Sequence, residues 1–245
     1  MANWKNLLKT LDRKVLGIIN ITTDSFSGDG AYKNSEKLSK LLEKAKSERI
    51  EILDIGCMST KPEYKKIDTS EEIKRLNFFI QNNMEKFYLS IDTMNSEVAN
   101  HALNNKFEII NDVSGFRDSH MIDIALEQKS KIILVHNHPD SFDIHQKMKY
   151  KNLLDEVKAH LHKKITELLK LGFNEGQIAV DPGLGFGKKI EDSAELLKKI
   201  EQFQFGFPIV VGYSNKKFTQ LLNMSSKDLF QHSLNSGVDL VRLHI

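Results

Sequence analysis

The chain is poor in cysteine and has no long apolar run. Its only cysteine, Cys57, has no partner for an internal disulfide, so we expect an ordinary buried thiol and a reducing, cytoplasmic location. No stretch approaches the roughly 18 consecutive apolar residues of a membrane-spanning helix. Residues 1–14 are polar and charged and lack the apolar centre of a signal peptide. These absences argue against a disulfide-stabilised, secreted or membrane-spanning protein.

An excess of charge of either sign is also missing. The 35 basic and 33 acidic residues leave a net charge of +2, which gives no general electrostatic attraction to nucleic acid. Hydrophobic residues make up 40% of the chain and charged residues 28%, as in an ordinary globular protein. Neither nucleic acid nor a membrane is therefore expected as a partner.

Short apolar runs rich in β-branched residues recur along the chain, with amphipathic stretches between them. Strands in a parallel sheet are buried on both faces, so they read as nearly continuous apolar runs. Eight runs have this character: Val15–Ile19, Ile50–Ile55, Phe87–Ile91, Glu108–Ile110, Ile132–Val135, Ile178–Val180, Pro208–Val211 and Val238–Leu243. We predict that they form eight parallel strands.

The stretches between these runs have helical spacing. Residues 38–45 carry one apolar stripe and residues 153–169 another, with Gly172 as a C-cap after the second. Strand followed by helix, repeated without a strand-rich or helix-rich block, predicts an α/β fold with a parallel sheet. Length alone would also allow an open doubly wound sheet, but eight repeats favour a single (β/α)₈ TIM-barrel domain spanning residues 1–245.

The predicted barrel has one irregular feature at its end. The sequence stops at Ile245, directly after the eighth run, and no helix follows to cover that strand. We expect that the segment before Leu11 takes the place of this helix or that a partner covers the strand, unless the chain is a fragment.

Polar residues follow almost every predicted strand. A single Asp or Asn in such a place is typical of strand ends and helix N-caps. In a barrel, however, the carboxyl ends of all strands face one mouth, where active sites of this architecture lie. The groups are Asn20 to Asp24, Asp54 to Gly56, Asp92-Thr93, Asn111-Asp112, His136 to His138, Asp181 to Gly183, Gly212 to Ser214, and Arg242 to His244. Together they predict a binding site for a polar ligand.

Several of these segments resemble the signature motifs of the dihydropteroate synthase family, in the order of that family and from about Leu16 to the end of the chain. The first and the fifth are specific, and the others are weak alone. The motifs are Leu16-Gly-Ile-Ile-Asn-Ile-Thr-Thr-Asp-Ser-Phe-Ser27, Asp54-Ile-Gly-Cys-Met-Ser-Thr-Lys-Pro62, Ser90-Ile-Asp-Thr93, Ile110-Asn-Asp-Val113, Asp181-Pro-Gly-Leu-Gly-Phe-Gly-Lys188, Gly212-Tyr-Ser-Asn-Lys-Lys-Phe218 and Val241-Arg-Leu-His244.

The resemblance implies a (β/α)₈ barrel that joins 6-hydroxymethyl-7,8-dihydropterin diphosphate to 4-aminobenzoate and releases pyrophosphate. It implies that Asp92, Asn111, Asp181 and Lys216 line the pterin site. The residue types agree, because carboxylates accept from the ring N–H and amino groups of a pterin, an amide does both and lysine donates. The resemblance also implies a homodimer.

The remaining roles follow from the resemblance too. Asn20, Arg242 and His244 would hold the diphosphate together with Mg²⁺, to which Asn20 is the implied ligand. Arginine suits phosphate because its planar fork donates two parallel hydrogen bonds. Asp181, Lys216 and Asp24 would be catalytic, with Asp181 stabilising the cationic pterin that remains when pyrophosphate leaves. The implied contacts to aminobenzoate are Phe26, Ser59, Thr60 and Ser214.

The chain departs from the family on the aminobenzoate side. Met58 and Lys61 replace an acid and an arginine, and Asn215 replaces a second arginine. Thr23 stands where the family has proline, and His136-Asn137-His138 replaces a His-Met-Gln element. Lysine does not reproduce the planar contacts of arginine. We therefore expect weak binding of 4-aminobenzoate, or another amine, beside normal binding of the pterin diphosphate.

Three alternatives remain open from the sequence. A barrel hydrolase with a metal bound by His136 and His138 is one, because residues two apart at a strand end point the same way. A pterin- or folate-binding methyltransferase is another, although such domains lack the Ser214-x-Lys216 element. The third is a paralogue that binds pterin without turnover. The glycines from Gly183 to Gly187 match neither phosphate-binding glycine motif and predict a tight loop below the pterin.

Overall fold

The computed structural model of the protein describes residues 3–23, 30–58, 67–83, 86–141 and 143–245. Four of the predicted site residues, Asp24, Phe26, Ser59 and Thr60, lie outside the described residues, as does Lys61.

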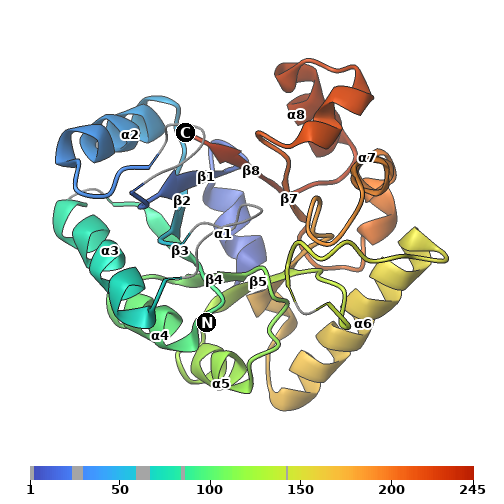
Figure 1. Ribbon diagram of the computed structural model, residues 1–245, viewed down its shortest axis with the longest axis horizontal. Coiled ribbons are helices and arrows are strands. Elements are labelled where there is room, and N and C mark those ends of the chain that lie inside the picture. Colours follow the sequence, from blue (N-terminus) through green and yellow to red (C-terminus); the bar gives the residue numbers. More distant parts are fainter. Residues whose placement is uncertain (1–2, 24–29, 59–66, 84–85, 142) are drawn as a thin grey trace.

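Eight parallel strands form the centre of the molecule and confirm the predicted barrel (Figure 1). Their order is β6-β5-β4-β3-β2-β1-β8-β7, and a parallel bridge between Val180 and Ile209 joins β6 to β7. The strands are β1 (Val15–Asn20), β2 (Ile52–Gly56), β3 (Tyr88–Asp92), β4 (Ile109–Asp112), β5 (Lys131–Val135), β6 (Ile178–Asp181), β7 (Val210–Gly212) and β8 (Leu240–His244). All eight predicted runs are strands, and most extend one or two residues further toward the C-terminus than predicted.

A helix follows each of the first seven strands and packs on the outside of the barrel (Figure 1). Polar N-cap side chains start most of them, as Asp68 and Asn95 do by accepting from backbone N–H groups. Gly172, at φ 112°, ends the longest helix as predicted. These helices are α2 (Ser35–Ser47), α3 (Thr69–Asn82), α4 (Ser96–Asn104), α5 (Ser119–Glu127), α6 (Leu153–Leu171), α7 (Ile190–Lys198) and α8 (Ser226–Asn235), and short 3₁₀ turns are η1 (Glu175–Gln177), η2 (Ile200–Phe203) and η3 (Lys217–Leu222).

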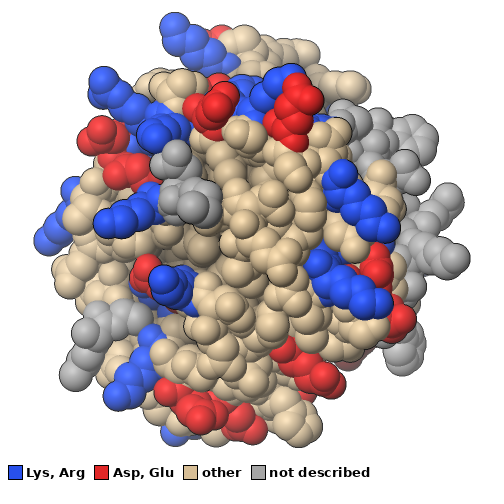
Figure 2. Space-filling model, turned by 90° about the vertical axis from the view of Figure 1, so that its left-hand side faces the viewer, with Lys and Arg blue, Asp and Glu red and all other residues tan. Residues whose placement is uncertain are grey.

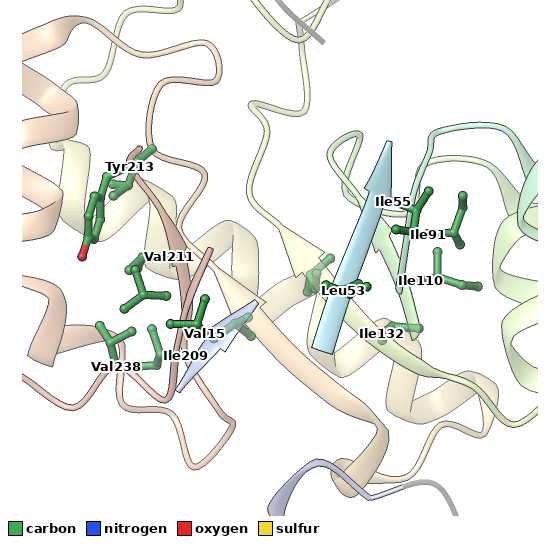
Figure 3. Packing of buried hydrophobic residues seen from close by; sticks show 14 of the residues in the cluster. Val15, Leu53, Ile55, Ile91, Ile110, Ile132, Ile209, Val211, Tyr213 and Val238 are labelled. Atoms are coloured by element: carbon green, nitrogen blue, oxygen red, sulfur yellow. The ribbon is translucent and has the colours of Figure 1, made fainter. Parts of the chain in front are cut away.

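The larger hydrophobic core lies between the strands and the surrounding helices (Figure 3). Successive residues of a strand point to opposite faces, so one set of apolar side chains faces the helices. Leu53, Ile55, Ile91 and Ile110 belong to this set and are fully buried. The helices that cover them hold the strand ends in fixed positions, which a binding site at the mouth requires.

A second apolar cluster fills the N-terminal half of the barrel interior. Leu16, Ile52 and Ile133 belong to it, together with the buried face of α1 (Trp4–Thr10). The indole N–H of Trp4 donates to the carbonyl oxygens of Ile132 and Gln177, at 3.1 and 3.0 Å. The expectation that the segment before Leu11 covers β8 is therefore wrong, because α1 instead closes the N-terminal end of the barrel.

The outer face of β8 packs against the larger hydrophobic core, and α8 contacts the strand. No helix follows β8 in the described chain, and Leu243 and Ile245 are partly buried against the outer core. Gly17 on β1 makes room for this packing, since a Cβ there would lie 2.6 Å from the Ile245 Cδ1.

The face that carries α2 and α3 has side chains of both charges, so it has no strong electrostatic potential of one sign. Lysine and arginine side chains alternate there with aspartate and glutamate side chains (Figure 2). Among the helices that the structure describes, none is long and apolar enough to cross a membrane.

Candidate active site

The site is built around Asp54, which projects into the barrel from the middle of β2. Its carboxylate is completely buried and accepts from three side chains. Ser90 Oγ lies 2.6 Å from Oδ1, and Asn111 Nδ2 and Arg242 Nε lie 2.9 and 2.5 Å from Oδ2. Because these partners come from three other strands, Asp54 joins the strands just above the apolar interior.

Asp92, at the end of β3, lies beside this centre. Arg242 Nη2 donates to its Oδ2, so one guanidinium joins two carboxylates. Burial raises the pKa of Asp92, while Arg242 opposes this rise and the neighbouring Asp54 adds to it. Within the described chain, no hydrogen-bond donor reaches Asp92 Oδ1 or Asn111 Oδ1, although both atoms are buried. Buried acceptors of this kind are costly unless a ligand supplies donors.

Asp181 and Lys216 form the opposite part of the mouth. Asp181 ends β6, and its Oδ1 accepts from Gly183 N at 2.7 Å, while Lys216 Nζ donates to the carbonyl oxygen of Leu184. Burial lowers the pKa of Lys216 to about 8, and Asp181 opposes this effect. Burial also raises the pKa of Asp181, and the charges of Lys216 and Arg242 oppose it. The two groups thus favour each other's charged form.

Lys188 lies beneath the loop of residues 182–187 and stabilises it. Its Nζ is buried and donates to the carbonyl oxygens of Gly183 and Phe186 at 2.9 and 3.1 Å. Gly183 is required here, because it has φ 71° and a Cβ would lie 1.9 Å from the carbonyl oxygen of His136. The predicted tight loop is therefore present, and the buried amino group of Lys188 holds it.

The ends of β1, β7 and β8 place further polar groups at the mouth. A Cβ on Gly56 would lie 3.1 Å from Asn20 Oδ1 and 3.8 Å from Asp92 Oδ2, so the absence of a side chain leaves room between them. On the other side, the Ser214 hydroxyl lies 2.7 Å from His244 Nδ1 and accepts from His244 N at 3.2 Å. Ser214 thereby positions His244.

The structure brings most of the predicted residues together. Arg242 acts electrostatically on Asp92 and Asp181, and Lys216 acts on both carboxylates as well. Asn111 joins them through Asp54. The carboxylate-and-amide group predicted from Asp92, Asn111 and Asp181 therefore shares one end of the barrel. Cys57 is buried and free, as expected.

The two strand-end histidines do not form a metal pair. His136 Nδ1 faces Lys188 Nζ at 3.0 Å, and its Nε2 lies 3.3 Å from Nδ1 of His160 on α6. His138 Nδ1 accepts from Asp140 N at 3.2 Å. In the described parts of the chain, no three His, Cys, Asp or Glu residues are placed to hold a metal. The geometry thus gives the hydrolase alternative no support.

Sequence reasoning missed the roles of Asp54, Ser90 and Lys188. Asp54 and Ser90 lie within motifs that the sequence identifies. Their residue types, however, do not show which strand-end polar side chain accepts hydrogen bonds from the others. Register supplies this information, because Asp54 on β2 pairs with Ser90 on β3 and both point to the same side.

Comparison with known proteins agrees with this geometry. The family described as "Pterin binding enzyme" matches residues 16–244. Dihydropteroate synthase of Streptococcus pyogenes serotype M1 is 32% identical over 244 residues, covering 94% of this chain and 89% of the relative.

Solved structures are similar over nearly the whole chain. Dihydropteroate synthase from Anaplasma phagocytophilum with bound 6-hydroxymethylpterin monophosphate is 29% identical with a TM-score of 0.81, covering 95% of this chain and 93% of that one. The Xanthomonas albilineans enzyme with 4-aminobenzoic acid is 27% identical with a TM-score of 0.83, covering 95% and 88%. The chain therefore belongs to the pterin-binding enzymes and, among them, to the dihydropteroate synthase family.

Proposed function

We propose that this protein is a dihydropteroate synthase, a transferase of folate biosynthesis that condenses 6-hydroxymethyl-7,8-dihydropterin diphosphate with 4-aminobenzoate and releases pyrophosphate. The observation that carries the proposal is the pair of buried acceptors, Asp92 Oδ1 and Asn111 Oδ1, which have no donor among the described residues. A pterin edge presents ring N–H and amino donors to such acceptors. A site whose buried groups stay unpaired with a wrong ligand discriminates strongly against it.

Asp92, Asn111, Asp181 and Lys216 would bind the pterin. Two of them are carboxylates, one is an amide and one is an ammonium group, which matches a ring edge with both donors and acceptors. Burial raises the pKa of Asp181, and the neighbouring charge of Lys216 opposes this rise, while Asp181 in turn opposes the lowering of the Lys216 pKa. Each group thus favours the charged form of the other beside the ring that both would bind.

Asn20, Arg242 and His244 would bind the diphosphate from the ends of β1 and β8. This donor set offers Mg²⁺ few protein oxygens, which fits the ion because it takes most of its other ligands from phosphate oxygens and water. The amide oxygen of Asn20 is the group that would hold it. When bound, Mg²⁺ supplies positive charge that stabilises pyrophosphate as a leaving group.

The reaction needs no covalent enzyme intermediate. The bond between the pterin methylene carbon and the diphosphate oxygen breaks, and its electron pair leaves with pyrophosphate. The amine of 4-aminobenzoate then supplies the pair for the new C–N bond and loses a proton to solvent. Asp181 stabilises the positive charge on the pterin, and Arg242 and His244 stabilise the departing anion. The charge of Lys216 favours the ionised form of Asp181, and Asp24, outside the described residues, would complete the catalytic set.

The acceptor side of the site is the altered one. Ser214 is described and partly buried, while its predicted companions Phe26, Ser59 and Thr60 are outside the described residues. Asn215 is exposed and its amide lies 3.3 Å from His244 Nδ1. With neither family arginine present, charge-assisted bonds worth roughly 1.5–3 kcal/mol each would be missing. We therefore propose a high KM for 4-aminobenzoate, or a preference for another amine.

Binding and turnover separate this function from its alternative. Calorimetry with a non-hydrolysable analogue of the pterin diphosphate tests the pterin site, and a pyrophosphate-release assay with 4-aminobenzoate tests the reaction. Binding followed by release supports the synthase. Binding of the pterin without release of pyrophosphate, with 4-aminobenzoate or other aromatic amines, would instead indicate a pterin-binding paralogue without turnover. The loss of both family arginines favours this alternative.

We also propose that residues 1–245 form a single domain, that the protein is cytoplasmic and that it forms a homodimer. The eight strands of one sheet span the chain, which supports the single domain. The dimer is what the resemblance to the family implies. Analytical ultracentrifugation tests the dimer, and a monomer at micromolar concentration would contradict it.

A further inference from the structure

In the structure, Arg242 pairs with two carboxylates, although it is proposed to bind the diphosphate. Its guanidinium donates to Asp54 Oδ2 through Nε and to Asp92 Oδ2 through Nη2. Its side chain is 16% exposed, and those of the two carboxylates are 0% and 6% exposed. A cation so placed occupies Oδ2 of Asp92, so a pterin that presents two donors to both oxygens of this carboxylate would have to displace it.

The two carboxylates differ in the hydrogen bonds that they would keep if Arg242 moved away. Asp54 also accepts from Ser90 and Asn111, so it stays hydrogen-bonded if Arg242 moves. Asp92 has no second side-chain donor among the described residues, and its Oδ1 is buried without any partner. Asp54 is thus a fixed anchor, whereas Asp92 depends on Arg242.

We propose that Arg242 exchanges partners during the reaction, and that this exchange makes the site selective for a pterin that carries a diphosphate. The inference rests on the proposed function. Pterin donors replace the guanidinium on Asp92, and the distal end of Arg242 turns from Asp92 to the diphosphate while Nε stays near Asp54. The arginine fork suits both positions, because carboxylate and phosphate present similar oxygen pairs.

Neither half of the substrate alone completes this exchange. A pterin without phosphate must compete with Arg242 for Asp92 Oδ2 and leaves the guanidinium without its second anion. Pyrophosphate alone draws Arg242 away and leaves a buried carboxylate without a donor, which is unfavourable. When both are present, one ion pair is lost and both charges find new partners. The two ligands therefore bind with positive cooperativity, which is reciprocal by thermodynamic linkage.

The same exchange favours product release. The condensation product carries no diphosphate, so Arg242 can return to Asp92 once pyrophosphate has left. There it competes with the ring N–H donors of the product. Arg242 is thus a specificity-determining residue that distinguishes substrate from product by the presence of the anion.

Calorimetric titration of the full chain tests the exchange. 6-Hydroxymethylpterin and inorganic pyrophosphate with Mg²⁺ are titrated separately, and pyrophosphate is then titrated with the pterin at saturation. We expect the Kd of pyrophosphate to fall at least tenfold when the pterin is bound. Measurable binding of both ligands with an unchanged Kd would overturn the exchange alone. No measurable binding of the pterin even with pyrophosphate and Mg²⁺ at saturation would overturn the proposed function and the inference that rests on it.

Variants assign the cooperativity to Arg242. Arg242→Gln should bind pyrophosphate weakly, with a Kd that the pterin changes by less than twofold. Arg242→Lys is the second variant, because it keeps one charge near the acids if the glutamine variant does not fold, and it should also lose most of the effect. His244→Asn is the matched control, which should weaken pyrophosphate binding but keep the tenfold effect of the pterin.

The titrations are repeated at higher pH, since removal of Arg242 raises the pKa of Asp92. Full cooperativity in both Arg242 variants would overturn the proposal, as would its loss in His244→Asn.

Discussion

Asn111 and Asp112, neighbours on β4, face opposite sides of the barrel wall. Asn111 points inward, where its amide donates to Asp54. Asp112 is equally buried, but it accepts from the backbone N–H groups of Ser114 and Phe116 at 2.7 and 2.9 Å. One side chain is thus available to a ligand in the mouth, and the other fixes the turn that leads to α5.

This division predicts different defects for two buried aspartates. We expect Asp181→Asn to lower kcat by about 10²–10³-fold, the scale on which removal of one charge-stabilising group acts. Asp112→Asn is the control, and it should lower the melting temperature while the folded enzyme keeps kcat within about twofold, since Asp112 faces away from the mouth. Steady-state kinetics and thermal melts measure both. A normal kcat in Asp181→Asn would contradict the charge-stabilising role.

The aminobenzoate side offers a gain-of-function prediction. We expect Asn215→Arg to lower the KM for 4-aminobenzoate about tenfold, because one charge-assisted hydrogen bond contributes roughly 1.5–3 kcal/mol. Asn215 has φ 61°, so arginine there costs up to about 1 kcal/mol of stability. The KM for the pterin diphosphate serves as the internal control and should stay unchanged. An unaltered KM for 4-aminobenzoate would show that Asn215 is not what weakens the acceptor site.

Residue types alone could not assign these roles. Both faces of each strand are buried, so hydrophobicity does not show which face points into the barrel. The resemblance to the synthase motifs supplied Asp92, Asn111 and Asp181 as candidates. Asp54 lies in the same motifs, but its three hydrogen bonds depend on the register of four strands, which no local pattern contains.

At the scale of elements, the loop after β6 depends on two lysines. Lys188 donates to the carbonyl oxygens of Gly183 and Phe186 from below, and Lys216 donates to that of Leu184. The glycines of this loop predict a turn from the sequence. They do not reveal Lys188, because lysine is exposed in most proteins and a lysine after a glycine-rich loop would normally be assigned to solvent.

The buried amino group of Lys188 predicts a rise of stability with pH. Burial lowers its pKa from 10.5 to about 7, so between these values the unfolded chain binds a proton that the folded chain has lost. The free energy of unfolding then increases by about 1.4 kcal/mol per pH unit. Lys188→Met should remove this contribution, as measured by urea unfolding between pH 7 and 10.

Lys216 gives a parallel contribution above its pKa of about 8, so some slope will remain in that variant. The adjacent Lys189, whose side chain is exposed, provides the control, and Lys189→Met should keep the slope of the natural protein. A slope in Lys188→Met equal to that of the natural protein would show that Lys188 is not neutral in the folded state.

Strand boundaries show a second limit at this scale. The predicted strands end at the last apolar residue, whereas β1, β3, β4 and β6 continue through Asn20, Asp92, Asp112 and Asp181. Backbone pairing continues through these polar residues because the ladder needs only N–H and C=O groups, as in the register of Asp92 with Asn111. The strands thus hold the polar side chains rigidly, which suits a preorganised site.

At the scale of the whole molecule, the barrel separates chemistry from stability. The polar mouth uses the C-terminal ends of the strands, and the apolar interior and α1 fill the other end. The sequence predicted the eight strands and the polar groups at their ends, but its expectation that the segment before Leu11 covers β8 was wrong. The amphipathic pattern of residues 4–11 shows that this segment buries one face, and it cannot show which surface receives that face.

This separation predicts that a change in α1 affects folding and leaves catalysis intact. Trp4 is fully buried, and its indole N–H joins β5 and the turn before β6 through the carbonyl oxygens of Ile132 and Gln177. Trp4→Ala should lower the free energy of unfolding by about 3–5 kcal/mol. Trp4→Phe keeps most of the apolar volume and should cost less, about 1–3 kcal/mol for the lost hydrogen bonds to two buried carbonyl oxygens. Urea unfolding and steady-state kinetics on the folded variants measure the two effects. A large drop of kcat in a variant that stays folded would mean that the N-terminal end of the barrel controls the geometry of the mouth.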